Sequence, residues 1–269
     1  MTRPATGSTW AGAGLGDIDP RLAERGPLQG VLIRDYRGAA TDISPFADEF
    51  GTVNFHPLAE DGTIRDDLLA ARMVNGEWRV NPNPNEGWVF VGAMAEDGGP
   101  ERSPNIENDD LYVLQSIYPY DSAVTQKGKT VAFTLVDTLK PLIHALEYDR
   151  RINDPVTGEL VLPEVGEVDY FVGATLDPAP VDRQILLWFA KDIDGLPLYR
   201  IEPVPRARLN NQEARRRSKT DPDQIPFEYM LLPDPYFLVP DKDGSRLVPG
   251  FDGVWIGGPA WEALAGDGS

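Results

Sequence analysis

The chain has 269 residues, of which 43 are acidic and 25 are Lys or Arg, so its formal net charge is −18 at pH 7. This balance argues against a protein that grips nucleic acid, because such proteins carry a basic footprint that neutralises phosphates. The chain contains no cysteine, which excludes disulfides, a thiolate nucleophile and a Cys-ligated zinc site. Its 26 Gly and 25 Pro residues favour short strands joined by turns over long helices.

Residues 1–26 are rich in Gly, Ala, Ser and Thr, and Trp10 is their single aromatic residue. This composition predicts an N-terminal arm with little to bury by itself. The arm is expected either to be a disordered terminus or to order against a neighbouring copy through Trp10. It lacks the apolar stretch of a signal peptide, so we expect it to stay on the mature chain. No apolar run approaches the about 18 residues of a membrane span, which predicts no membrane segment.

Residues 27–269 are predicted to form one mainly β domain. Short apolar or alternating segments bounded by turn residues indicate strands. In chain order these segments are 28–33, 42–50, 87–94, 111–118, 129–135, 168–176, 184–191, 198–202 and 226–231. The clearest alternation is in Lys129–Leu135, because Val131, Phe133 and Leu135 share one face. Asp192–Gly195 is predicted to join two of the strands as a hairpin turn, with Gly supplying a positive φ.

One helix is predicted, over about residues 138–148. Pro141 falls in its first turn, where a missing N–H costs nothing, and Asp137 or Thr138 can cap it. Apolar residues recur there at helical spacing and must dock on a sheet. They are Leu139, Leu142, Ile143 and Leu146. His144 lies beside this stripe and is interpreted as a packed or half-exposed helix residue, not a ligand.

These elements predict a mainly β fold, a β-sandwich or barrel with one short flanking α-helix and long loops. The longest loop is expected at about residues 207–224. It contains the basic run Arg215-Arg216-Arg217-Ser218-Lys219, which stands out in so acidic a chain. The run is interpreted either as a solvated loop or as an inter-subunit loop that meets an acidic patch, such as Glu107-Asn108-Asp109-Asp110, on a neighbouring copy.

Catalytic chemistry has no candidate in the sequence. The two histidines, His56 and His144, do not lie near a GxSxG-like elbow. The glycine-rich stretch 12–16 lacks the Lys and Ser/Thr of a phosphate-binding loop. The Asp-rich turns at 192–195 and 241–245 lack the ligand spacing of a calcium loop. We therefore predict that the protein is not an enzyme and that it holds no metal or cofactor.

A set of short motifs follows one another over about sixty residues. They are Gly87-Trp88, Gly92, Glu96-Asp97-Gly98, Gln115-Ser116, the threonine-alternating segment 130–138 and the helical segment 139–146. In this order the set resembles the core of siphophage major tail proteins, the tail-tube subunits of actinobacterial phages in particular. Residues 31–45, 227–231 and 257–261 are also similar to that family. The chain departs from the family pattern at Leu114, where an aromatic residue is usual.

The resemblance implies a structural virion protein. Six copies would form a ring, and rings would stack into the tail tube through which DNA is ejected without specific binding. The implied partners are further copies of the chain and other tail proteins, such as the tape measure, distal tail and tail terminator proteins. Assembly would take place in the host cytoplasm. The candidate interface residues are Trp10, Glu107, Asp109, Asp110, Gln115, Arg215, Arg216 and Arg217.

An alternative is a β-sandwich virion protein that binds a carbohydrate or a receptor. Such a protein would use exposed Trp and Tyr side chains as a binding platform. Trp88, Trp188 and Trp255 lie in apolar, strand-like contexts. We therefore expect these three to pack in the core, which favours the tube subunit over the alternative.

Overall fold

The computed structural model of the protein describes residues 21, 23, 27–46, 53, 55–75, 77–111, 121–173, 179–212 and 222–266. For residues 73, 78, 105–111 and 121–127 it describes the backbone alone. The strands are β1 (Leu28–Asp35), β2 (Ala71–Val74), β3 (Glu77–Val80), β4 (Val89–Phe90), β5 (Glu101–Leu111), β6 (Asp121–Leu135), β7 (Arg183–Ile193), β8 (Leu196–Asn211), β9 (Ile225–Leu231), β10 (Leu238–Pro240), β11 (Leu247–Pro249) and β12 (Trp255–Gly257). The helices are α1 (Pro141–Glu147), α2 (Pro259–Gly266) and the 3-10 turn η2 (Gly38–Thr41).

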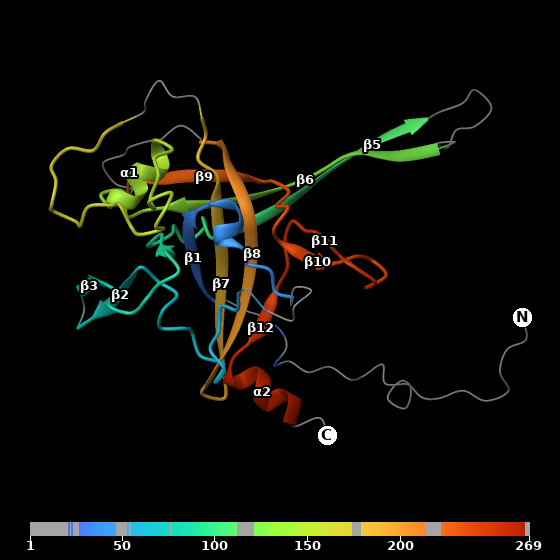
Figure 1. The fold of residues 1–269 in the computed structure, drawn as a ribbon, viewed down its shortest axis with the longest axis horizontal. Coiled ribbons are helices and arrows are strands. Elements are labelled where there is room, and N and C mark those ends of the chain that lie inside the picture. Colours follow the sequence, from blue (N-terminus) through green and yellow to red (C-terminus); the bar gives the residue numbers. More distant parts are fainter. Residues whose placement is uncertain are drawn as a thin grey trace, which may run out of the picture.

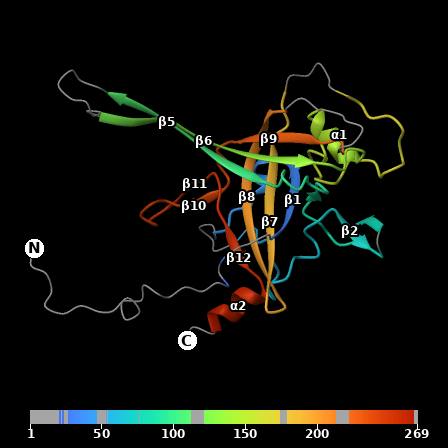
Figure 2. The ribbon, with the colours of Figure 1, turned by 180° about the vertical axis from the view of Figure 1, so that it is seen from behind.

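One antiparallel sheet of eight strands dominates the fold. Its order is β4-β1-β7-β8-β9-β6-β5, and β12 pairs with the first half of β8. Figures 1 and 2 show β6 and β9 crossing the direction of β7 and β8, so the sheet curls strongly. The segment after β4 reaches β6 on the far side, where Ala95 N donates to Thr134 O at 3.0 Å. The mainly β prediction is confirmed, but the sheet curls without closing into a barrel.

The curled sheet encloses the main hydrophobic core, which α1 covers. Val131, Phe133 and Leu135 of β6 are buried there, which confirms the predicted alternation. The same core contains Val31, Ile33, Leu142, Ile143, Leu146, Ile185, Leu187, Val204, Phe227, Tyr229 and Leu231. Full burial of each large apolar side chain is worth about 1.5–3 kcal/mol. The core therefore ties strands from both halves of the chain to one helix.

A second core lies on the opposite face of β1 and β7. Leu32, Leu186 and Trp188 point to it and meet Trp88 and Phe237, which come from outside the central strands. Both faces of β7 are therefore buried. This explains why its sequence is a continuous apolar run without alternation.

The helix α1 begins later than its predicted start. Leu142, Ile143 and Leu146 are buried as expected, but Leu139 precedes the helix and its side chain is 84% exposed. The predicted cap is also wrong, because Lys140 occupies the N-cap position and makes no side-chain cap hydrogen bond. The Asp137 carboxylate accepts the N–H of Ala93 instead, at 3.0 Å. It fastens the segment after β4 to the sheet, so it is not free to cap.

The turn between β7 and β8 forms as predicted. Asp194 and Gly195 have φ values of 54° and 85°, the left-handed pair that a tight hairpin of this type requires. The side chain of Asp192 accepts the N–H of Gly195 at 2.8 Å. The local sequence is thus sufficient to join the two long central strands in register.

Two further strand predictions are wrong where the structure describes them, because residues 42–46 and 168–173 form no strand. The predicted strand 111–118 lies outside the described residues except for Leu111. The long strand β5, a polar stretch at residues 101–111, and the helix α2 were not predicted. β5 is the last strand of the sheet and pairs with β6 alone, and its sequence carries no apolar alternation that would predict it.

Two cross-strand pairs at one end of β1 and β7 bury a polar network. Asp35 lies opposite Arg183 in the register, and their side chains form an ion pair with almost no exposure. The Asp35 carboxylate also accepts the N–H of Ile152 at 2.9 Å and of Asn153 at 3.1 Å. Asn153 returns the contact, since its side-chain oxygen accepts the N–H of Asp35 at 2.9 Å. The network therefore fixes the chain after α1 to the end of the sheet.

The neighbouring pair, Arg34 and Gln184, binds two further loops. Nε of Arg34 donates to Gln184 at 2.8 Å, and its Nη1 donates to the carbonyl oxygen of Glu86 at 2.6 Å. Gln184 in turn donates to the carbonyl oxygen of Thr41 at 2.8 Å. The guanidinium lies 4.4 Å from the ring centre of Trp88. Burial lowers the pKa of Arg34 to about 10, so the side chain stays charged at neutral pH.

We expect Asp35→Ala to lower the free energy of unfolding by about 3–5 kcal/mol, because it removes the buried partner of Arg183 and leaves only the more exposed Asp149, 3.7 Å away, near that charge. Urea unfolding followed by tryptophan fluorescence measures this. Asp61→Ala is the matched control, since Asp61 makes its 2.9 Å bond to the N–H of Thr63 in an exposed turn. Equal midpoints for the two variants would show that the buried pair is not a main source of stability.

Candidate functional site

The longest feature outside the body of the molecule is a two-stranded ribbon. β6 pairs with β9 only from Thr130 to Leu135, whereas it pairs with β5 from Ala132 back to Asp121. Residues 105–111 and 121–128, called here the projecting ribbon, therefore continue past the rest of the sheet. At about 3.3 Å per residue the ribbon extends roughly 23 Å. Figures 1 and 2 show it leaving the body to one side.

The outer edge of the ribbon is open. β5 is the last strand of the sheet, and no other strand among the described residues pairs with its outer edge. Such an edge presents a row of backbone N–H and C=O groups to a pairing partner. A register shift beside Glu107 interrupts the ladder, because Glu107 pairs with Gln126 and Asn108 with Val124. Bulges of this kind bend a strand and increase its twist.

Ion pairs fix the root of the ribbon to the body. Arg102 of β5 bonds Glu202 of β8 at 2.8 Å and Asp252 at 3.2 Å, and Lys129 of β6 also pairs with Asp252. These side chains are between 15% and 36% exposed, so the charges are less screened than those of a surface pair. The sequence held no signal for these pairs, because their partners are 100 or more residues apart.

The predicted interface residues are placed unevenly. Glu107, Asp109 and Asp110 all lie on β5 within the projecting ribbon, where they pair with Gln126, Ala123 and Ser122. The remaining predicted residues lie outside the described part of the chain. They are Trp10, Gln115, Arg215, Arg216 and Arg217. The structure thus places the three predicted acids on one strand. Their contact with the arginines stays a prediction, because the arginines lie outside the described residues.

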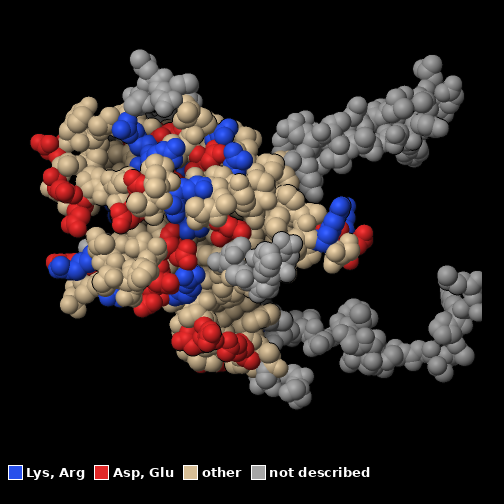
Figure 3. Space-filling view, in the orientation of Figure 1, with Lys and Arg blue, Asp and Glu red and all other residues tan. Residues whose placement is uncertain are grey.

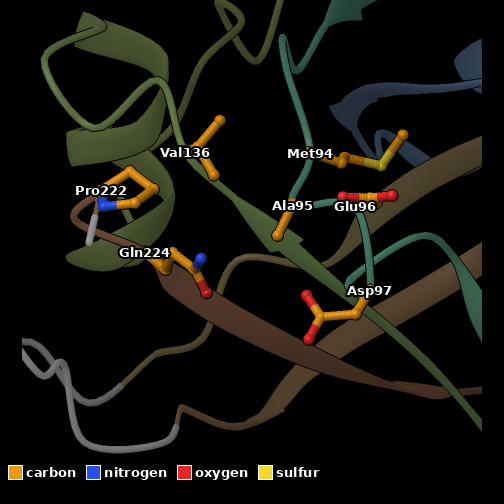
Figure 4. A pocket seen from close by; sticks show the side chains of 7 residues that line it. All are labelled: Met94, Ala95, Glu96, Asp97, Val136, Pro222 and Gln224. Atoms are coloured by element: carbon orange, nitrogen blue, oxygen red, sulfur yellow. The ribbon is translucent and has the colours of Figure 1, made fainter. Parts of the chain in front are cut away.

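A shallow hollow lies between the segment after β4 and the start of β9 (Figure 4). It is lined by Met94, Ala95, Glu96, Asp97, Val136, Pro222 and Gln224. Asp97 and Gln224 face each other across it. The lining supplies carboxylates but no nucleophile and no histidine, so it has no arrangement for acyl or phosphoryl transfer.

The two histidines are used in packing. His144 stacks on Phe171 with ring centres 4.8 Å apart, and its Nδ1 lies 3.8 Å from the carboxylate of Glu147. Nδ1 of His56 lies 2.9 Å from the carbonyl oxygen of Leu58. Among the described residues no three His, Asp or Glu side chains gather as a metal site would require. No described helix has the length and apolar character needed to cross a membrane.

The tryptophans expected in the core are found there. Trp88 is fully buried, Trp188 is 8% exposed, and Trp255 packs edge-on against Phe55 with ring centres 5.8 Å apart. Trp88 and Trp188 therefore present no aromatic face to solvent of the kind that binds sugars. Trp261 and Tyr170, by contrast, are 40% and 75% exposed, so the carbohydrate-binding alternative keeps exposed aromatic side chains of the kind it requires.

No family model matches this chain, and no curated protein sequence matches it. The open, projecting ribbon is therefore the feature on which a functional proposal depends. It combines a long free edge, a fixed root and three acidic residues on one strand.

The end of β8, from which the basic run departs, is held by charge. The Asp182 carboxylate accepts a hydrogen bond from Arg206 and another from Arg208, each at 2.7 Å. Burial alone would raise the pKa of Asp182, but the hydrogen bonds from Arg208 and Arg206 hold that pKa below its ordinary value. A carboxylate with a depressed folded-state pKa stabilises the fold above its unfolded pKa of about 3.9 and loses this contribution as the pH falls through the folded value.

We therefore expect Asp182→Asn to be less stable than the wild type at pH 7. The difference should shrink below about pH 4, because both chains then lack the charged carboxylate. Urea unfolding midpoints measured from pH 7 down to pH 3 give the comparison. A constant difference across this range would contradict the assigned charge interaction.

Proposed function

We propose that this protein is a structural, non-enzymatic subunit of a phage-type tail tube. It assembles with copies of itself into hexameric rings, and the rings stack into a conduit for DNA. The observation that carries the proposal is the projecting ribbon, which holds the second half of the eleven-residue strand β5 and whose outer edge pairs with no described strand. The motifs shared with siphophage tail-tube subunits supply the specific identity.

The open edge supports self-assembly on physical grounds. Soluble proteins usually shorten, cover or interrupt edge strands, since a long free edge pairs with other chains. At the other end of the sheet, the short strand β4 pairs with β1 at Leu32 and Ile33, and Val91 N donates to the carbonyl oxygen of Val31 at 3.0 Å. A contact between unlike ends of the sheet is heterologous, and repetition of such a contact closes into a ring when the rotation allows it. Closure satisfies the backbone groups that a single copy leaves open.

The charge of the chain fits a conduit for DNA. Affinity for DNA arises when Lys and Arg neutralise phosphates and release counterions. A subunit with a net charge of −18 makes few such contacts, so DNA can slide past it. In this proposal the ring lies in the tail tube of the virion after assembly in the host cytoplasm. Its ends meet other tail proteins, such as the tape measure, distal tail and tail terminator proteins.

Removal of the ribbon tests the proposal. In one variant an Asn-Gly turn replaces residues 106–127 and joins Asn105 to Gly128, which are partners in the register. We expect the wild type to form rings or tubes in negative-stain electron microscopy and the variant to stay a folded monomer, because the pairing edge is gone. Circular dichroism and light scattering report folding and mass.

The control variant places the same Asn-Gly turn over residues 242–245, the exposed turn between β10 and β11. It should assemble like the wild type. Rings formed by the ribbon-less variant, or a wild type that stays monomeric at high concentration with its tail partners present, would contradict the proposal.

A further inference from the structure

Residues 154–173, called here the apolar strap, connect the region after α1 towards β7. Figure 1 shows the strap as the yellow-green to yellow loop on the side of the molecule away from the projecting ribbon. Six of its apolar side chains are exposed to solvent. They are Val156, Val161, Val165, Val168, Tyr170 and Val172. Val156, Val165 and Tyr170 are 84%, 76% and 75% exposed, values unusual for such side chains on a free surface.

The strap is held in place at both ends. Leu160 forms a bridge with Asn153, and Val161 N donates to the carbonyl oxygen of Ile152 at 3.0 Å. At the other end Phe171 stacks on His144 of α1. Between these attachments the strap forms no strand. Its apolar side chains are therefore presented by a segment that is attached to the body on both sides.

The strap is also strongly acidic. It contains five acids, Asp154, Glu159, Glu164, Glu167 and Asp169, and no Lys or Arg. Asp154 is used locally, since it accepts the N–H groups of Val156 and Thr157 at 2.8 Å. The other four make no ion pair with any residue that the structure describes. Figure 3 shows acidic side chains along the margin of the molecule that the strap forms. Its complement must therefore be basic and able to cover apolar surface.

One segment of the chain has that chemistry. Arg215-Arg216-Arg217-Ser218-Lys219 is a basic run that carries long aliphatic stems, which can lie along apolar side chains while the charges meet carboxylates. Many other basic side chains are engaged within the subunit, as Arg102, Arg183 and Arg206 are. The run departs from the end of β8 after Gln212 and the chain returns at Pro222.

We propose that the apolar strap is a docking surface for a second copy of this chain, whose basic run 215–219 is the occupant. The inference rests on the proposed self-assembly and names the surface that the basic run meets. It replaces the acidic stretch 107–110 of the projecting ribbon as the partner of the arginines. Each subunit then contacts its neighbours through two separate surfaces, the ribbon and the strap, which lie on different sides of the body.

Charge reversal tests the pairing. Glu164, Glu167 and Asp169 are replaced together by Arg in one variant, and Arg215, Arg216 and Arg217 by Glu in another. Each is expected to raise the protein concentration needed for assembly by about tenfold or more, because like charges then face each other. The two triple changes combined in one chain should restore assembly to near the wild-type concentration. Light scattering and negative-stain microscopy report assembly.

The matched control reverses Glu107, Asp109 and Asp110 of the projecting ribbon to Arg, an equal change of charge. It should gain nothing from the Arg-to-Glu change in the basic run. If the Arg-to-Glu change in the basic run rescues assembly of this ribbon variant and not of the strap variant, the inference is overturned. The ribbon would then be the surface that the arginines contact.

Mixing separates contact between copies from contact within one copy. The strap variant and the basic-run variant, each assembling poorly alone, should assemble when mixed, because each copy then meets a complementary neighbour. If the two variants fail to assemble when mixed, while the chain that combines both changes does assemble, the basic run contacts the strap of its own copy. That outcome would overturn docking between copies.

A neutral change tests the apolar contribution. Val165→Ser with Tyr170→Ser leaves the charge unchanged and is expected to weaken assembly severalfold, while circular dichroism stays that of the wild type. If the wild type assembles and the strap variants assemble equally well, the strap proposal is wrong, and the proposed function is not affected. A wild type that never assembles would overturn both.

Discussion

The buried ion pair between Asp35 and Arg183 is the constraint on which the rest of the structure depends. It joins β1 to β7, which lie far apart in the sequence, and it fixes the chain that follows α1 through the N–H groups of Ile152 and Asn153. Burying a charge is costly unless it is paired and hydrogen-bonded. Any arrangement that separates these strands leaves a charge uncompensated in the core. The pair thus specifies one register for the centre of the sheet.

A fixed centre allows the margins of the sheet to remain open. The curl of the sheet and the core beneath α1 hold β6 and β9, and ion pairs at Arg102 and Lys129 hold the root of the ribbon. The ribbon can then extend as two strands, although an isolated two-stranded hairpin is only marginally stable in water. In the proposed assembly a neighbouring copy supplies the missing strand contacts. A rigid body with open edges suits a subunit that is completed by its copies.

The acidic residues divide into two groups with different consequences. Asp35, Asp182 and Asp252 are engaged by Arg or Lys within the subunit and hold strands together. Four acids of the strap, Glu159, Glu164, Glu167 and Asp169, are exposed and form no ion pair with a described residue. With a net charge of −18, copies repel one another at long range, and assembly must overcome this through specific contacts. A basic run that meets an acidic, apolar surface would provide such a contact and fix the orientation of neighbours.

Local sequence determined those features that need only near neighbours. The alternation of Val131, Phe133 and Leu135 predicted a half-buried strand, Asp194-Gly195 predicted the hairpin turn, and the apolar spacing around Leu142 predicted α1. Side-chain periodicity and positive φ are properties of a few consecutive residues, so they can be read directly.

Only the tertiary structure decided the rest. The polar strand β5 carries no periodic apolar signal, and its place as the last strand of the sheet follows only from its pairing with β6. The acids of β5 in the candidate interface are neighbours in the sequence, so the sequence alone predicted that they lie together. Their position on a projecting ribbon depends on the pairing of the whole sheet. The bond between Arg34 and Gln184 joins residues 150 positions apart. Contacts at that distance exist only once the sheet has formed, so no local pattern records them.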